Sequence, residues 1–219
     1  LGAMTRNALP RDGFLLGVAA MAAVVLASNI LVQFLAGQWL TWGAFTYPLA
    51  FLVTDVTNRV YGPERARRVV LAGFAMGVLC SLVGTQVAGE TGPLVTPRVA
   101  IASGLAFLVA QLTDVAIFHR LREGSWWRAP LASTLVGSAL DTAIFFTIAF
   151  SAALAPLFPA TDVAWANEAL PLLGLGPVTP LWTSLAVADF GVKLALAAIA
   201  LVPFRAIVLH LQPAAGRLR

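Results

Sequence analysis

The stretch LAVADFGVKLALAAIAL, residues 185–201, has the apolar character of a membrane-spanning helix, but Asp189 and Lys193 lie in its middle. A helix needs about 20 apolar residues to cross a hydrocarbon core of about 30 Å. An ionisable residue at that depth costs at least about 2.5 to 3.5 kcal/mol on insertion scales, so each one is a candidate functional residue. The stretch therefore predicts both a membrane protein and a polar site inside it.

The rest of the chain has the same character. Hydrophobic residues make up 59% of its 219 residues and charged residues 11%, whereas an ordinary soluble domain has about 25% charged residues. Five or six apolar stretches of about 20 residues lie near 14–36, 42–60, 69–88, 100–118, 129–154 and 181–207. We expect an all-α integral membrane protein with six transmembrane helices, forming one domain over residues 4–219. Residues 1–3 are interpreted as a cloning remnant.

The arginines are distributed unevenly over the connections. With six spans and the N-terminus inside, twelve arginines fall on the inner side and only Arg98 on the outer side. Cytoplasmic loops of membrane proteins carry such an excess, so we expect both termini to be cytoplasmic and residues 155–180 to lie outside. The net charge of +4 then reflects topology in a lipid bilayer, and we expect no direct nucleic-acid binding.

Polar residues inside the expected spans are spaced so that they share helix faces. Residues three or four apart are neighbours on a helix, as are Gln111 and Asp114, or Asp189 and Lys193. We expect the acid and base of the second pair to neutralise each other, leaving Asp114 and Asp141 without a lysine. The residues expected to face the interior are Asn29, Gln33, Asp55, Gln111, Asp114, Asp141, Asp189 and Lys193.

The sequence leaves open whether the polar residues form a site or only join helices, and whether a motif of small residues packs within one chain or between two chains. Buried amides can serve only to join helices, but four carboxylates with one lysine would leave such a set unbalanced in charge. Asp55 is a weaker candidate because Arg59 follows it by one turn. The small-xxx-small motif GFAMG, residues 73–77, fits close packing within one chain or a homodimer seam equally well.

Several classes of protein are disfavoured. The single cysteine, Cys80, lies in an apolar span and offers no disulfide or cysteine-based metal cluster. The chain has no Walker A, H-E-x-x-H or G-x-S-x-G pattern, and these patterns carry ATP hydrolysis, zinc proteolysis and acyl transfer. We therefore expect neither an enzyme nor a resident cofactor.

Five segments of the chain resemble the queuosine precursor transporter family: SNILVQ (28–33), TWGAFTYPLAFLVTDVTNRVYG (41–62), RVAIASGLAFLVAQLTDVAIFHRLR (98–122), WWRAPLASTLVGSALDTAIFFTIAF (126–150) and VADFGVKLAL (187–196). The resemblance implies a bacterial inner-membrane carrier for 7-deazaguanine bases, chiefly 7-cyano-7-deazaguanine, used in tRNA modification. It also implies a shape like the substrate-binding component of ECF-type vitamin transporters. The alternative is such a component that needs a separate ATPase. One departure is Arg59, which follows Asn58 where many relatives have an acid.

The polar residues suit the ligand that the resemblance implies. A guanine-like edge offers an N–H and an NH2 group side by side, which one carboxylate can accept together, while its carbonyl needs a donor. Its flat ring favours aromatic walls. The candidate edge readers are Asp114, Asp141 and Asp189, the candidate donors Asn29, Gln33, Gln111 and Lys193, and the candidate walls Trp42, Phe45 and Tyr47. The sequence does not decide which carboxylate meets the base.

Overall fold

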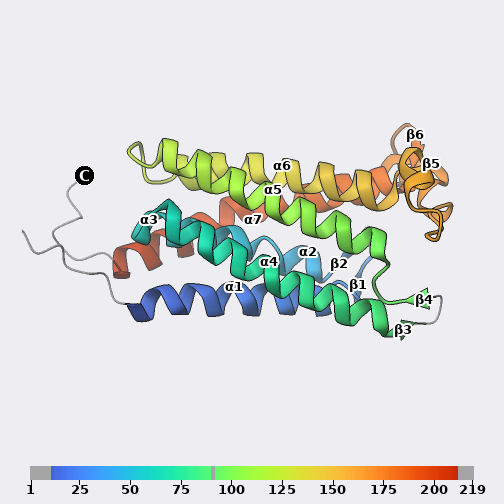
Figure 1. The fold of residues 1–219 in the computed structure, drawn as a ribbon. Coiled ribbons are helices and arrows are strands. Elements are labelled where there is room, and N and C mark those ends of the chain that lie inside the picture. Colours follow the sequence, from blue (N-terminus) through green and yellow to red (C-terminus); the bar gives the residue numbers. More distant parts are fainter. Residues whose placement is uncertain (1–10, 90–91, 212–219) are drawn as a thin grey trace, which may run out of the picture.

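The computed structural model describes residues 11–89 and 92–211, which form a bundle of long helices (Figure 1). The expected cloning remnant at residues 1–3 lies outside these ranges, as do Arg6, Arg217 and Arg219.

Most of the described chain is helical. The long helices are α1 (Arg11–Leu31), α4 (Pro63–Gln86), α5 (Pro97–Leu121), α6 (Arg128–Phe150) and α7 (Leu181–Leu211), and the short ones are α2 (Gly43–Thr46) and α3 (Leu49–Tyr61). Three antiparallel hairpins pair β1 (Leu35–Ala36) with β2 (Leu40–Thr41), β3 (Ala88–Gly89) with β4 (Gly92–Pro93), and β5 (Ala169–Pro171) with β6 (Val178–Pro180). The connection between α6 and α7 also contains three 3-10 helices, η1 (Ala152–Leu157), η2 (Trp165–Asn167) and η3 (Leu172–Gly174).

Five of these helices, α1, α4, α5, α6 and α7, are long and apolar enough to cross a membrane, among the residues described. Each coincides with one of the expected spans. The first span is shorter than expected, because α1 ends at Leu31 and the hairpin β1–β2 follows it. Helices α5 and α6, which correspond to the expected spans 100–118 and 129–154, begin and end within a few residues of those limits. The prediction of a multi-pass helical membrane protein is therefore confirmed.

The expected span over residues 42–60 is a kinked segment rather than one regular helix. α3 alone has 13 residues, which extend only about 20 Å at 1.5 Å per residue. Pro48 separates it from α2, and a proline interrupts a helix because it has no N–H to donate and its ring clashes with the preceding turn. Tyr47 and Pro48 nevertheless keep right-handed helical dihedral angles. The segment from α2 through α3 thus continues in one general direction for about 28 Å.

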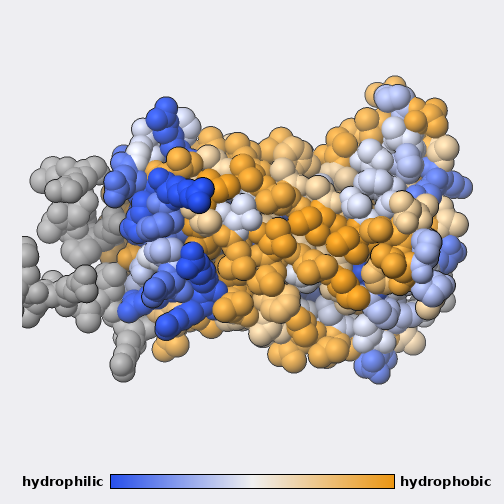
Figure 2. Space-filling view, turned by 45° about the horizontal axis from the view of Figure 1, so that its top comes forward, coloured by the Kyte–Doolittle hydropathy of each residue, from blue (hydrophilic) through white to orange (hydrophobic). Residues whose placement is uncertain are grey.

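The two ends of the bundle differ in chemistry. At one end, here called the arginine-rich end, α3 passes into α4 and α5 into α6, and these turns bring together Arg59, Arg65, Arg67, Arg68, Arg120, Arg122 and Arg128. The three hairpins lie at the opposite end, called the hairpin end (Figure 1). Figure 2 shows a hydrophilic band at the arginine-rich end and a largely hydrophobic surface over the middle of the bundle. This pattern suits a protein whose middle faces lipid.

Arg98, the one arginine expected at the other end, is buried and serves the fold. Its Nε donates to the carbonyl of Ile148 at 2.7 Å, and its Nη2 donates to the carbonyl of Ser151 at 2.6 Å. These carbonyls belong to the last turn of α6 and the residue after it, where a helix leaves acceptors unpaired and carries partial negative charge. Arg98 therefore caps α6 from the start of α5.

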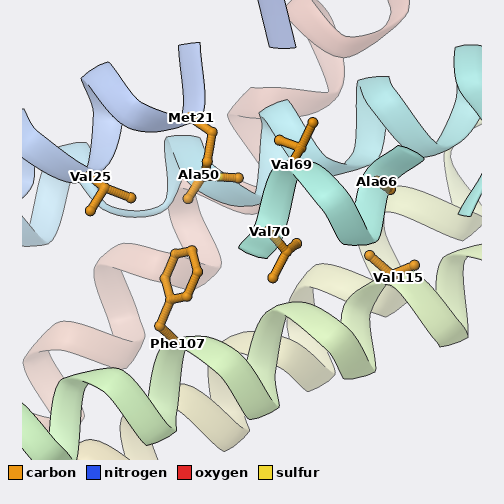
Figure 3. Packing of buried hydrophobic residues seen from close by; sticks show 8 residues of the cluster. All are labelled: Met21, Val25, Ala50, Ala66, Val69, Val70, Phe107 and Val115. Carbon is orange, nitrogen blue, oxygen red and sulfur yellow. The ribbon is translucent and has the colours of Figure 1, made fainter. Parts of the chain in front are cut away.

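The small-xxx-small motif packs inside the chain, between α4 and α1. A Cβ added at Gly73 would lie 2.6 Å from Cγ of Met21, whereas one at Gly77 would lie 3.6 Å from the side chain of Val25. Met21 is fully buried in a cluster that also includes Val70 and Phe107 (Figure 3). Of the two readings left open by the sequence, the structure supports close packing within one chain at this motif.

Gly73→Val should therefore destabilise the protein, because added volume in a tightly packed core costs about 1 to 3 kcal/mol. Gly77→Ala is the matched control and should unfold at the temperature of the unsubstituted protein. Thermal unfolding in detergent, followed by size-exclusion chromatography, measures both. A Gly73→Val protein that keeps its stability and changes only its oligomeric state would instead support a homodimer seam.

Candidate functional site

The most highly connected polar side chain in the middle of the bundle is that of Lys193. It is the only lysine in the chain, and the residue is 3% exposed. Its Nζ donates to Oδ2 of Asp189 at 2.5 Å, to Oδ2 of Asp141 at 2.6 Å and to Oγ1 of Thr142 at 3.0 Å. An ammonium group has three donors, so all three are used.

Thr142 and Tyr47 complete the arrangement. The hydroxyl of Thr142 donates to Oδ2 of Asp189 at 2.8 Å, and the hydroxyl of Tyr47 donates to Oδ1 of Asp141 at 3.0 Å. The ammonium of Lys193 also lies 5.6 Å from the centre of the Tyr47 ring, within the range of a cation–π contact. We call Tyr47, Asp141, Thr142, Asp189 and Lys193 the lysine cluster.

Three separate elements position the lysine cluster. Asp189 and Lys193 are one turn apart on α7, Asp141 faces them from α6, and Tyr47 comes from the kink between α2 and α3. The expected ion pair of Asp189 with Lys193 is confirmed. The expectation that Asp141 lacks a lysine is wrong, because the flexible stem of Lys193 reaches across to α6 as well as along its own helix.

The lysine cluster combines hydrogen-bond acceptors and donors at one place in the core. With both carboxylates ionised, one positive charge faces two negative charges, so the site retains acceptor capacity. Asp189 is the more accessible carboxylate, with 14% of its side chain exposed. Tyr47 and Lys193 supply donors beside these acceptors. Such a set of convergent acceptors and donors fits a flat polar ligand with both kinds of group on one edge.

A second polar group, on the arginine-rich side of the first, contains the other two carboxylates. The Asp55 carboxylate on α3 accepts from Ser133 at 3.4 Å and from Thr134 at 3.2 Å, both on α6. The carboxyl of Asp114 on α5 adjoins the carboxyl of Asp55 and the hydroxyl of Ser133. Asp55 and Asp114 are 3% and 0% exposed. We call these two residues the carboxyl pair.

Arg59, which follows Asp55 by one turn in the sequence, forms no ion pair with Asp55. Its Nη1 donates to the carbonyl of Arg122, and its guanidinium lies 5.2 Å from the centre of the Phe118 ring. The ion pairs found among the described residues both belong to Lys193. Asp55 is therefore satisfied by hydroxyl groups of α6 and not by a cation.

Gln111 lies one turn from Asp114 and is fully buried, as expected of an inward-facing residue. Its Oε1 accepts from Thr54 at 2.6 Å, which joins α5 to α3. Gln111 thus belongs to the neighbourhood of the carboxyl pair and not to the lysine cluster.

Four other candidates are not brought into either group. Asn29 donates to the carbonyl of Val25 on its own helix at 2.9 Å. Gln33 follows the end of α1 and is exposed, so it does not share a helix face with Asn29. Trp42 and Phe45 are 54% and 37% exposed, with ring centres 5.8 Å apart. Of the three aromatic residues expected to form walls of the site, Tyr47 is the one that belongs to the lysine cluster, through its contacts with Asp141 and Lys193.

Sequence reasoning missed the hydroxyl groups that complete both sites. Thr142 follows Asp141 directly, and Thr134 follows Ser133 directly, so each has an acidic or hydroxyl neighbour in the sequence. Threonine is common in membrane helices, where it often bonds only to its own backbone, so its presence alone is a weak signal. The spacing of eight residues from Ser133 and Thr134 to Asp141 and Thr142 was the available clue.

These features define a multi-pass membrane protein that encloses a charged polar site. Comparisons with known proteins agree with that class. The sequence profile of a family described as "Putative vitamin uptake transporter" matches residues 41–208. No solved structure matches the chain.

Similar proteins from three bacteria identify the family more narrowly. The queuosine precursor transporter of Escherichia coli (strain K12) is 40% identical over 141 residues, which are 58% of this chain and 64% of that protein. The probable queuosine precursor transporters of Haemophilus influenzae and Bacillus subtilis are 33% and 36% identical over 78% and 53% of this chain. The alignments span 68% and 58% of those two proteins. The chain belongs to the queuosine precursor transporter family.

Substitutions that remove charge from the lysine cluster should differ sharply in their effects. Lys193→Gln should be the most harmful, because removing one partner of a buried ion pair costs about 3 to 5 kcal/mol. Adding Asp189→Asn should restore part of the stability, and adding Asp141→Asn as well should restore more, because no unpaired charge then remains. Folded yield and thermal unfolding in detergent measure this order. Equal stability of the single and triple variants would contradict the assigned charges.

Proposed function

We propose that the chain imports queuosine precursors, 7-cyano-7-deazaguanine or related 7-deazaguanine bases, across the inner membrane of a bacterium for use in tRNA modification. The observation that carries the proposal is the lysine cluster, enclosed among the helices of a queuosine precursor transporter family member. It functions as a carrier with no enzymatic step.

The lysine cluster supplies complementary groups for the polar edge of such a base. The carboxylate of Asp189 or Asp141 would accept the adjacent N–H and NH2 groups as a pair, and Tyr47 or Lys193 would donate to the neighbouring carbonyl. In the structure these side chains bond to one another. Ligand binding would exchange those bonds for equivalent ones, so little hydrogen-bonding energy is lost when the site closes on the base.

The orientation proposed for the carrier follows from its two ends. The arginine-rich end would face the cytoplasm, in accord with the bias of positive residues toward that side. The burial of Arg98 beneath the end of α6 supports this orientation, since it leaves few basic side chains at the hairpin end. The kinked α2–α3 segment would be the sixth span, with both termini cytoplasmic.

Cysteine labelling tests this orientation. In a Cys80→Ser background, Asp162→Cys should react with a membrane-impermeant thiol reagent added outside intact cells, because Asp162 is exposed in the connection between α6 and α7. Glu123→Cys, in the exposed turn between α5 and α6, should react only after the membrane is opened. The reverse pattern would invert the proposed topology.

Uptake in cells tests the substrate and the site together. A strain that cannot make the precursor should accumulate queuosine in its tRNA when it expresses this chain and receives 7-cyano-7-deazaguanine. Asp141→Asn should abolish that accumulation, because it removes a carboxylate bound by both Lys193 and Tyr47. Asp162→Asn is the matched surface control and should behave as the unsubstituted protein, provided that immunoblots show equal amounts in the membrane. Normal uptake by Asp141→Asn would show that the site lies elsewhere.

A second candidate is a binding component that depends on a separate ATPase, and the description of the matching family as a vitamin uptake transporter favours it. The two candidates differ in one measurement. The purified chain, reconstituted alone into liposomes, should move the base across the bilayer if it is a self-sufficient carrier. A chain that binds the base tightly but moves none of it would support the second candidate.

A further inference from the structure

The carboxyl pair lies in the most deeply buried polar region outside the lysine cluster, and several atoms there have no partner. Both carboxylate oxygens of Asp114, Nε2 of Gln111, Oδ1 of Asn58 and Oγ of Ser138 are buried without a hydrogen bond. The four residues are fully buried, on α3, α5 and α6. Buried polar groups are nearly always satisfied, so these atoms indicate a place where water, an ion or a proton completes their hydrogen bonds.

Protons account for the carboxyl pair better than any neighbouring cation does. The carboxyls of Asp55 and Asp114 are neighbours that act on each other electrostatically, on either side of Ser133. Two such groups repel each other when both are ionised in a low-dielectric interior. A proton on either carboxyl would remove that repulsion.

Among the described residues, no charged side chain of the surrounding elements forms an ion pair with Asp55 or Asp114. Arg59 on α3 donates to the carbonyl of Arg122, although its Nη2 has no partner. Arg65 on α4 lies against the rings of Phe14 and Tyr61.

On α7, Arg205 lies 4.4 Å from the centre of a Trp126 ring, and the residues of that helix nearest to Asp55 are apolar. The facing residues of α6 are the hydroxyls of Ser133 and Thr134. The proton on the pair can therefore leave or return without displacing an ion pair.

A small cavity lies beside Asp55. It has a volume of about 10 Å³ and is lined by Asp55 and Thr134 on one side and by α7 residues, including Ala197 and Phe204, on the other. A volume of this size holds about one water molecule. A water there can exchange a proton with the carboxyl pair.

Helix α6 connects the carboxyl pair to the lysine cluster. Ser133 and Thr134 bond to the pair, and Asp141 and Thr142, about 12 Å farther along the helix, bond to Lys193. Between them, a Cβ on Gly137 would lie 2.7 Å from the ring of Phe51 on α3. Because residues of both polar groups lie on α6, a shift of this helix would move both groups.

We propose that Asp55 and Asp114 form a proton-binding site whose loading is coupled, through α6, to binding of the substrate at the lysine cluster. This inference rests on the proposed function as a carrier. A proton from water on the outer side is taken up by a carboxylate oxygen of the pair and released to water on the cytoplasmic side, once for each base carried. No other co-reactant is required.

The experiment uses the purified full chain in liposomes with 7-cyano-7-deazaguanine as the probe and an interior one pH unit more alkaline than the exterior. If one proton is carried with each neutral base, the base should reach a concentration inside the liposomes about tenfold higher than outside. The reason is that one pH unit is a tenfold ratio in proton activity. Asp55→Asn and Asp114→Asn should each reduce the accumulation ratio to about one. Asp162→Asn, on the surface, should leave it at the value of the unsubstituted protein.

Two further measurements separate this proposal from the proposed function. Both pair variants should bind the base, measured by calorimetry, and should exchange labelled for unlabelled base across the bilayer, because asparagine mimics a permanently protonated carboxyl. If the unsubstituted protein neither binds nor exchanges the base, the proposed function fails. If it exchanges the base but accumulates none with the pH gradient, or accumulates it only with a sodium gradient, proton coupling is overturned. Accumulation by the pair variants equal to that of the unsubstituted protein would also overturn it.

Discussion

The attraction between the ammonium of Lys193 and two carboxylates is the constraint around which the bundle is organised. An isolated charge at this depth would be costly to insert into the membrane. If Lys193 paired with only one of Asp141 and Asp189, the other carboxylate would be buried without a partner. Because Nζ bonds to Asp141 on α6 and to Asp189 on its own helix, the register of α7 against α6 is fixed to within a fraction of a turn. Tyr47 extends the same constraint to the kinked segment, since its hydroxyl reaches the same carboxylate.

Helix α6 is the element that carries this constraint through the rest of the molecule. Its small and hydroxyl residues let α5 and α3 approach closely, and Arg98 closes its end from the start of α5. Both polar groups therefore lie on one helix, separated by about two turns. A single helix is therefore in direct contact with both polar groups.

Composition and hydropathy were enough to predict the membrane class and the approximate spans, because helix length in lipid is fixed by bilayer thickness. The ion pair of Asp189 with Lys193 was also predictable, since a spacing of four residues determines proximity on one helix. The link to Asp141 was not, because contacts between helices depend on their relative rotation, which no local spacing reveals. The sequence placed Gln33 on the helix face of Asn29, but the helix ends two residues before it.

The kink between α2 and α3 shows a different limit. Pro48 was visible in the sequence, but prolines are tolerated in membrane helices, so its presence did not decide between a straight and a kinked span. The structure places Tyr47 at this kink, where the side chain reaches the lysine cluster. A local feature that weakens a helix is thus also the feature that directs an aromatic donor toward the interior.

The presence of only one lysine in the chain has a spectroscopic consequence. Cells supplied with nitrogen-15 lysine would produce a protein with a single labelled side-chain amine, located between two carboxylates. Its resonance would report the charge state and hydrogen bonding of that one group without any substitution.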